Sequence, residues 1–193
     1  MFEKLRAYFE TKMDLNDDQF RIIERTFTPR KMSKGEFLQR EGEAAKYGAF
    51  VISGCLRSYK IDQKGKEHIL QFAPENWWIS EFESAMRGES AHYFIDAIAD
   101  SEILVSDFES QRRLMDEVPA FGKSFLEGQQ RRTAAKDHRI ISSLSATAEE
   151  RYLDFIKTYP SIAQVVPQHM VASYLGLTPE TISRVRKQLT TKK

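Results

Sequence analysis

The chain has 193 residues, of which 41% are hydrophobic and 30% charged, and its net charge is +1. This composition is typical of an ordinary globular protein, and the length allows one large domain or a sensor with a small second domain. No apolar run approaches the roughly 18–20 residues that cross a bilayer, and the first residues show no export-signal pattern. Cys55 is the single cysteine, so no intramolecular disulfide can form. We therefore expect a cytoplasmic protein without a membrane partner.

The charge is distributed unevenly along the chain. From residue 167 onward, five lysines and arginines stand against one acidic residue. That tail carries about +4 and the rest about −3, a small basic module on a mildly acidic body, which suits binding to a phosphate backbone. A solvated C-terminus would carry the same charge, so charge alone leaves both interpretations open.

Residues 1–27 have apolar side chains at helical spacing, and Pro29 ends the pattern because the residue before a proline avoids the α region. From residue 30 to 107 the pattern changes to short apolar runs separated by turn residues, with a hairpin loop at 62–65. Such runs indicate an antiparallel barrel or sandwich. The predicted strands are 49–52, 56–61, 68–72, 94–98 and 103–105.

Pro119 opens a long helical stretch with a very polar middle. A helix of about 25 residues would span roughly 37 Å, too long for a small domain to cover one face. We favour a helix that packs on its twin in a dimer; a helix lying across its own barrel is the alternative. Thr147 and Glu150 then form a capping-box pattern that starts a further helix, which ends before Pro160.

The segment 167–189 carries the most specific pattern. A short amphipathic helix is followed by Gly176, whose permissive backbone suits a tight turn between helices. Thr178 is a good N-cap and Pro179 suits the first helical position. A second helix then has one apolar stripe, formed by Ile182, Val185 and Leu189. An ordinary pair of helices explains the stripe, but a helix-turn-helix also explains the cap, the glycine and the basic exposed face.

The face opposite this stripe carries side chains that can bond to bases or phosphates, namely Glu180, Ser183, Arg184 and Lys187. Arg184 can bond bidentately to guanine, and Glu180 can accept from cytosine N4. Thr178, Thr181 and Arg186 are better suited to phosphates, which fix the register without reading sequence.

This segment resembles the helix-turn-helix of the Crp/Fnr family of bacterial transcription regulators, and the resemblance extends over the whole chain in order. The family pattern R/P-E-T-V/I-S/G-R is matched by residues 179–184. The implied fold is α+β: an antiparallel, cyclic-nucleotide-binding-like β-roll, a long dimerisation helix, and a helical winged-helix-like domain without the terminal wing, since the sequence stops at Lys193. The implied domains are 1–110 for the sensor with flanking helices, 111–144 for the dimerisation helix and 145–193 for DNA binding.

The resemblance also implies residue roles and partners. Glu180 and Arg184 would contact bases, and His169, Thr178 and Thr181 would contact phosphates. Pro179 replaces the arginine that some members use, so one base contact is missing. The implied partners are double-stranded DNA with a symmetric site, a second copy of the chain and RNA polymerase.

The sensor half departs from the family's phosphate-binding cassette. Glu81 matches the residue that holds the ribose hydroxyl, but Ser80 stands at the glycine and Ala91, beside His92, at the phosphate-binding arginine. Without that arginine a buried phosphate lacks a strong partner, which argues against cyclic AMP. A less charged effector remains open, because aromatic side chains could line a pocket or simply fill the barrel. The predicted effector pocket comprises Ser80, Glu81, Phe82, Ala91, His92 and Tyr93.

Other cofactors have less support. An iron–sulfur cluster needs about four cysteines. The four histidines show no metal-ligand spacing, and nothing argues for haem. Trp77 and Trp78 cannot both face inward from one strand, so we expect one to be exposed or at an interface.

Two other classes of function fit the sequence less well. An enzyme on a small barrel would need a close histidine pair with an acid or a recognisable catalytic motif, and the sequence has neither. A β-roll that serves as a regulatory or scaffold module without binding DNA is the second alternative. The sequence favours a non-enzymatic, homodimeric DNA-binding regulator with no catalytic or metal-ligating residues.

Overall fold

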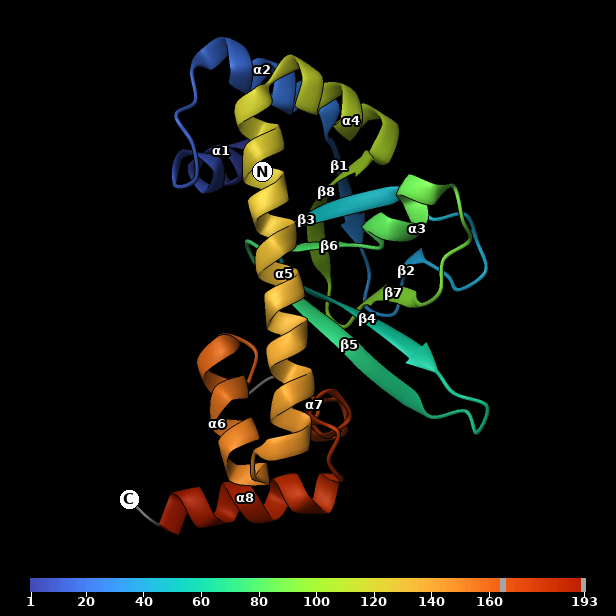
Figure 1. Ribbon diagram of the computed structural model, residues 1–193, viewed down its shortest axis with the longest axis vertical. Helices are drawn as coiled ribbons and strands as arrows, with labels where there is room; N and C mark the ends of the chain where they lie inside the picture. The colour runs from blue at the N-terminus through green and yellow to red at the C-terminus, as the bar shows by residue number, and fades with distance from the viewer. Residues whose placement is uncertain (164–165, 192–193) are drawn as a thin grey trace. The chain divides into compact units, whose positions relative to one another are not determined.

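The computed structural model describes residues 1–163 and 166–191. The chain divides into two compact units, one formed by residues 1–60 and 71–129 and the other by residues 61–70 and 130–193. Figure 1 shows the order of the helices and strands along the chain.

The first unit opens with two helices, α1 (Phe2–Glu10) and α2 (Asp17–Thr26), in place of the continuous helical region predicted over 1–27. A capping box separates them: the Asn16 side chain accepts from Gln19 N at 2.9 Å, and the Gln19 side chain accepts from Asn16 N at 3.2 Å. This reciprocal capping satisfies helix-end donors and fixes the start of α2.

The strands form two four-stranded sheets, in the orders β1-β8-β3-β6 and β2-β7-β4-β5. All five predicted strands are confirmed, while the strands at 28–32, 37–39 and 78–80 were missed because their sequences lack a strand pattern. The strands are β1 (Thr28–Met32), β2 (Phe37–Gln39), β3 (Tyr47–Ser53), β4 (Cys55–Ile61), β5 (Glu67–Pro74), β6 (Trp78–Ser80), β7 (Phe94–Ala97) and β8 (Ser101–Asp107).

The sheet β1-β8-β3-β6 is buried on both faces, which explains why β3 is almost continuously apolar. Ala49 and Val51 of β3 join the cluster that also contains side chains of β4 and β7, while Phe50 and Ile52 join the cluster under the helices. Successive side chains of a strand point to opposite faces. One strand therefore supplies both hydrophobic clusters, and the sheet is held between its partner sheet and the helices.

Trp77 and Trp78 also divide between the two clusters, and both are half-buried. The Trp78 ring lies 5.0 Å from the Phe50 ring and 5.6 Å from the Phe27 ring, between centroids. The two side chains thus face opposite ways, as predicted, and neither is exposed, because each face of this segment has its own apolar partner. That one of them lies at an interface with another chain stays a prediction.

Three helices complete this part of the chain: α3 (Phe82–Arg87), α4 (Phe108–Glu117) and α5 (Pro119–Ser145). The predicted dimerisation segment 111–144 is therefore not one helix. Its first residues belong to α4, which Asp107 caps by accepting from Ser110 N at 2.8 Å. Val118 separates the two helices, and Pro119 takes the first position of α5, where its missing N–H has no cost.

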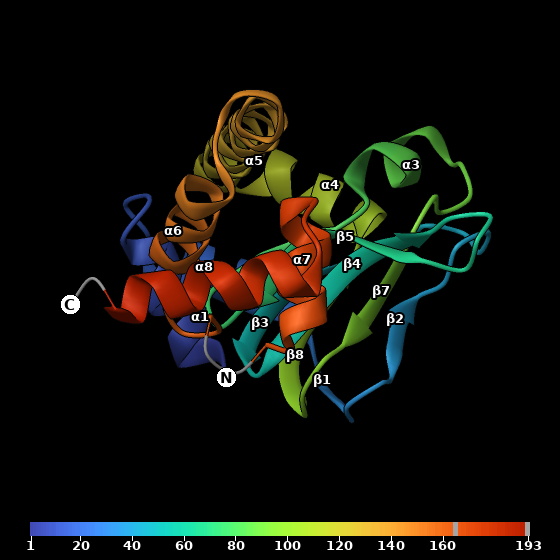
Figure 2. The same ribbon diagram turned by 90° about the horizontal axis from the view of Figure 1, so that it is seen from below.

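The second unit contains the hairpin 61–70, the end of α5, and the helices α6 (Ala148–Thr158), α7 (Gln168–Leu175) and α8 (Pro179–Thr191). The predicted capping box is confirmed, since Glu150 N donates to Thr147 Oγ1 at 3.2 Å and Thr147 N donates to Glu150 Oε2 at 2.8 Å. Figure 2 shows α7 crossing α8 at a steep angle. Absence of a terminal wing stays a prediction.

Candidate DNA-binding site and effector pocket

The turn between α7 and α8 is built as the sequence predicts. Gly176 ends α7 with a φ of +64°, in the left-handed region that favours glycine. Leu177 N donates to Ala172 O at 2.9 Å, and Arg151 of α6 donates to Leu175 O at 3.1 Å. These bonds occupy carbonyls at the end of α7 that the helix itself leaves unpaired.

The start of α8 is fixed by two side chains. Thr178 Oγ1 accepts from Thr181 N at 3.2 Å, which confirms the predicted N-cap. Gln168, at the first position of α7, donates from Nε2 to Pro179 O at 2.7 Å. The two helix starts are thus tied together, so α7 and α8 hold one relative orientation within this unit.

The apolar stripe of α8 anchors it on the other helices. Ile182 and Val185 are 1% and 4% exposed, and Leu189 is half-buried. An aromatic cluster forms part of the same core: the Phe155 and Tyr174 rings lie 5.7 Å apart, and the Tyr159 and Tyr174 rings 5.6 Å apart. α8 therefore presents its opposite face outward.

A helix turns about 100° per residue, so Glu180, Ser183, Arg184 and Lys187 lie on the side away from the buried stripe. All four are exposed. Thr181 and Arg186 fall on the two flanks of that face, Thr181 half-buried and Arg186 exposed. The remaining predicted DNA-binding residues are exposed at helix starts: His169 at the start of α7, and Thr178 and Pro179 at the start of α8.

The Glu180 carboxylate lies at the N-terminus of α8. Its own backbone N–H and then the Thr178 hydroxyl donate to it, and these bonds hold the pKa of Glu180 below its ordinary value. The side chain is therefore an ionised acceptor at neutral pH. The exposed face of α8 therefore carries an anionic acceptor in its first turn and the guanidinium of Arg184 one turn later.

Among the residues predicted to form the effector pocket, Glu81 is buried, with 5% exposure, and makes several hydrogen bonds. Its Oε1 accepts from the Ser84 hydroxyl at 2.7 Å and from His92 N at 2.8 Å, and lies 2.8 Å from His92 Nδ1. Its Oε2 accepts from Gln39 Nε2 at 2.8 Å. The carboxylate that would hold a ribose hydroxyl is thus already bonded to neighbouring side chains.

Five of the six predicted pocket residues lie close together. The Tyr93 hydroxyl donates to Ser80 O at 3.2 Å, and Ala91 precedes His92 in the same segment with 3% exposure. Phe82 is the exception: its ring packs against those of Phe108 and Phe125, with centroids 5.7 and 5.0 Å away. The ring of Phe82 is thus oriented by packing against α4 and α5, and its place in an effector pocket stays a prediction.

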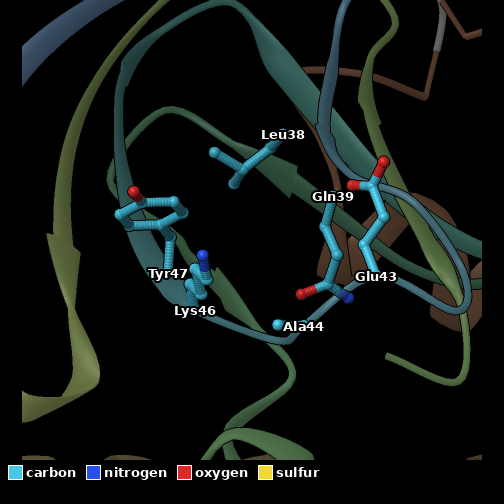
Figure 3. Close-up of a pocket in the computed structure, with 6 residues that line it drawn as sticks. All are labelled: Leu38, Gln39, Glu43, Ala44, Lys46 and Tyr47. Atoms are coloured by element: carbon cyan, nitrogen blue, oxygen red, sulfur yellow. The ribbon is translucent and has the colours of Figure 1, made fainter. Parts of the chain in front are cut away.

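Gln39 also lines a cavity of about 390 Å³. Figure 3 shows the Gln39 amide and the Leu38 and Tyr47 side chains around it. Its lining residues are Leu38, Gln39, Glu43, Ala44, Lys46 and Tyr47. Sequence reasoning missed Gln39, which bonds to Glu81 across 42 residues of chain, and no local pattern could have revealed it.

Within residues 1–163 and 166–191 there is no group of three or more His, Cys, Asp or Glu side chains that could hold a metal ion. In the same part of the chain, every helix is too short or too polar to span a membrane.

Comparison with known proteins agrees with this architecture. The cyclic nucleotide-binding domain family model matches residues 29–118. The transcriptional activator protein anr of Pseudomonas aeruginosa is 24% identical over 167 residues, which cover 81% of this chain and 68% of that protein. Electron transport regulator A of Shewanella oneidensis is 25% identical over 185 residues, which cover 90% of this chain and 71% of that protein.

Solved structures match over most of the chain. FixK2 from Bradyrhizobium japonicum superposes with a TM-score of 0.73 at 22% identity, over 86% of this chain and 85% of that one. A regulator of the Crp/Fnr family from Eubacterium rectale gives a TM-score of 0.70 at 20% identity, over 96% and 88%. Residues 29–118 thus resemble a cyclic nucleotide-binding domain, and the chain has the fold seen in structures of Crp/Fnr transcription regulators, as its sequence predicts.

Proposed function

We propose that this chain is a sequence-specific DNA-binding transcription regulator of the Crp/Fnr type. The observation that carries the proposal is α8: its apolar stripe is buried, its N-terminus is capped and tied to α7, and the polar face opposite the stripe is exposed. This is the arrangement by which a helix-turn-helix places its second helix in the major groove. The relatives named as transcriptional activators support the same function.

The exposed face of α8 suggests how sequence is read. Arg184 can bond bidentately to guanine, and the ionised Glu180 can accept from cytosine N4. Thr181 and Arg186 lie on the flanks of that face, where the phosphates that border the groove would meet them. His169 and Thr178 lie at helix starts, where a backbone phosphate is favoured by the helix dipole.

We propose a homodimer that pairs along α5. Four large apolar side chains on this helix are exposed, Leu126, Ile140, Ile141 and Leu144, at 60%, 57%, 62% and 84%. Leu126 and Ile140 are two heptads apart, the spacing that places residues on one seam of paired helices. Fully burying such a side chain contributes about 1.5–3 kcal/mol, so a twin helix would stabilise the pair substantially. The two recognition helices would then meet successive major grooves about 34 Å apart.

We further propose that any effector is not cyclic AMP. The buried Ala91 stands where the family has its phosphate-binding arginine, and the carboxylate of Glu81 is already hydrogen-bonded to other side chains of the chain. No resident cofactor or metal is part of the proposal. RNA polymerase is the expected protein partner, and binding to chromosomal DNA implies a cytoplasmic location.

The test is selection of fragmented genomic DNA by the purified protein at about 0.1 M salt, where phosphate contacts are still strong. We expect enrichment of a two-fold symmetric site that Arg184→Ala no longer selects. Arg21→Ala is the matched control, since it removes the same charge from α2, where the Arg21 side chain is 76% exposed.

Equal enrichment by the wild type and Arg184→Ala would refute the proposal that Arg184 contacts a base. Absence of enrichment by the wild type, with and without cell extract, would favour the alternative of a β-roll module that does not bind DNA. Such a module would also tolerate Glu180→Ala without loss of function.

A further inference from the structure

The hairpin between β4 and β5 belongs to the same compact unit as the helix-turn-helix. β5 is an outer strand in the order β2-β7-β4-β5, so one of its sides has no neighbouring strand. Backbone groups on such an edge need other partners when they are buried. A side chain of α7 provides them here.

Ser173 of α7 bonds to the hairpin in the manner of a neighbouring strand. Its hydroxyl donates to Glu67 O at 2.7 Å and accepts from Ile69 N at 3.0 Å, so one oxygen serves two residues of β5. Ile69 is 3% exposed. Its N–H is removed from bulk water, and loss of the Ser173 hydroxyl would leave that donor without this acceptor, which is costly.

A second contact joins the same hairpin to α5 and α7. Arg139 of α5 donates to Leu70 O at 2.8 Å, and its guanidinium lies 4.5 Å from the centroid of the Tyr174 ring of α7. The Tyr174 hydroxyl lies 3.3 Å from that of Tyr159. The hairpin backbone is therefore connected to the aromatic core on which α8 rests.

We propose that Ser173 and Arg139 are positioning residues for DNA recognition: they fasten α7 to the hairpin 61–70 and thereby set the orientation in which α8 is presented. Glu180 and Arg184 remain exposed while these contacts are made, so the arrangement is compatible with DNA binding. This inference rests on the proposed function.

The test compares Ser173→Ala with Ser173→Thr, which keeps the hydroxyl, and with Ser145→Ala. The last is a matched control, because the Ser145 hydroxyl bonds only to Ile141 O of its own helix at 2.9 Å among the bonds described. Residue-resolved amide exchange and affinity for the selected site are measured on the full-length protein. We expect Ser173→Ala to speed exchange at Ile69 but not at Lys66, whose amide donates to Asp62 inside the hairpin.

Affinity of Ser173→Ala for the selected site should fall about five- to tenfold, the effect of one lost hydrogen bond, with Ser173→Thr and Ser145→Ala near the wild type. Unchanged exchange at Ile69 would overturn the contact, and equal DNA affinity of the Ala and Thr variants would overturn its role in positioning. If the wild type selects no DNA, the proposed function fails, and the exchange at Ile69 still decides whether Ser173 holds the hairpin.

Discussion

The sheet β2-β7-β4-β5 contains a buried ion pair whose removal should have a large effect on stability. Arg57 of β4 and Asp96 of β7 face each other across the ladder, with Nε–Oδ1 2.8 Å and Nη2–Oδ2 3.1 Å apart. Their side chains are only 8% and 7% exposed. The Arg57 guanidinium also lies 4.1 Å from the Tyr59 ring centroid, so it is held on two sides.

Asp96→Ala removes the carboxylate and leaves the guanidinium buried. Breaking a buried pair in this way costs about 3–5 kcal/mol, whereas replacing both partners by apolar residues of similar size is often neutral. For a chain of this size that loss corresponds to a decrease in Tm of about 6–20 °C. The Arg57→Met, Asp96→Leu double variant should recover most of the lost stability.

Urea unfolding of the wild type, Asp96→Ala, Asp96→Asn and the double variant would measure these differences. Asp96→Asn is the matched control, because it keeps the shape of the side chain while removing its charge. If Asp96→Ala changes stability by less than about 0.5 kcal/mol, the size of an ordinary surface effect, the pair is not buried as described. A double variant no more stable than Asp96→Ala would contradict the reasoning about the uncompensated charge.

Three further predictions concern other parts of the chain. Burial raises the pKa of Cys55 to about 12, so iodoacetamide should alkylate it far more slowly in the folded protein than in urea at about pH 8; equal rates would be the contrary result. Ile140→Glu should produce monomers in sedimentation velocity if α5 pairs with a twin helix along the seam of Leu126 and Ile140, and an unchanged dimer would exclude this seam. The Thr147 N–H and hydroxyl lower the pKa of Glu150, so its stabilisation of α6 is present above the ordinary glutamate range and is lost as pH falls through the lowered value. The difference in urea midpoint between wild type and Glu150→Gln should therefore change between about pH 5 and pH 3, and a constant difference would contradict it.

The helix-turn-helix could be predicted because its signals are local. Gly176 ends α7, Thr178 caps α8 and Pro179 opens it, and each acts within a few residues of its position. The capping box at Thr147 was identifiable for the same reason. Such signals depend on backbone geometry and nearby hydrogen bonds, which a sequence displays directly.

The parts that escaped prediction depend on distant partners. β1 (Thr28–Met32) has a polar sequence and becomes a strand by pairing with β8, more than sixty residues away. The packing of the Phe82 ring against Phe108 of α4 and Phe125 of α5 was not predicted either. Gln39 completes the bonds of Glu81 from a short strand that no periodicity reveals. Tertiary packing determines each of these, so local patterns cannot.

The most direct test of the central claim couples a residue of α8 to one base pair. Fluorescence anisotropy would give the affinities of the wild type and Arg184→Ala for the selected site and for a version in which the guanine assigned to Arg184 is replaced in both half-sites. A bidentate arginine–guanine contact is worth about 1–3 kcal/mol per half-site, or about 2–6 kcal/mol when both half-sites are changed. The wild type should therefore prefer the original site by at least about thirtyfold, and Arg184→Ala should bind both sites equally. The same preference in Arg184→Ala would mean that Arg184 does not read this base, and would contradict the recognition mode proposed for α8.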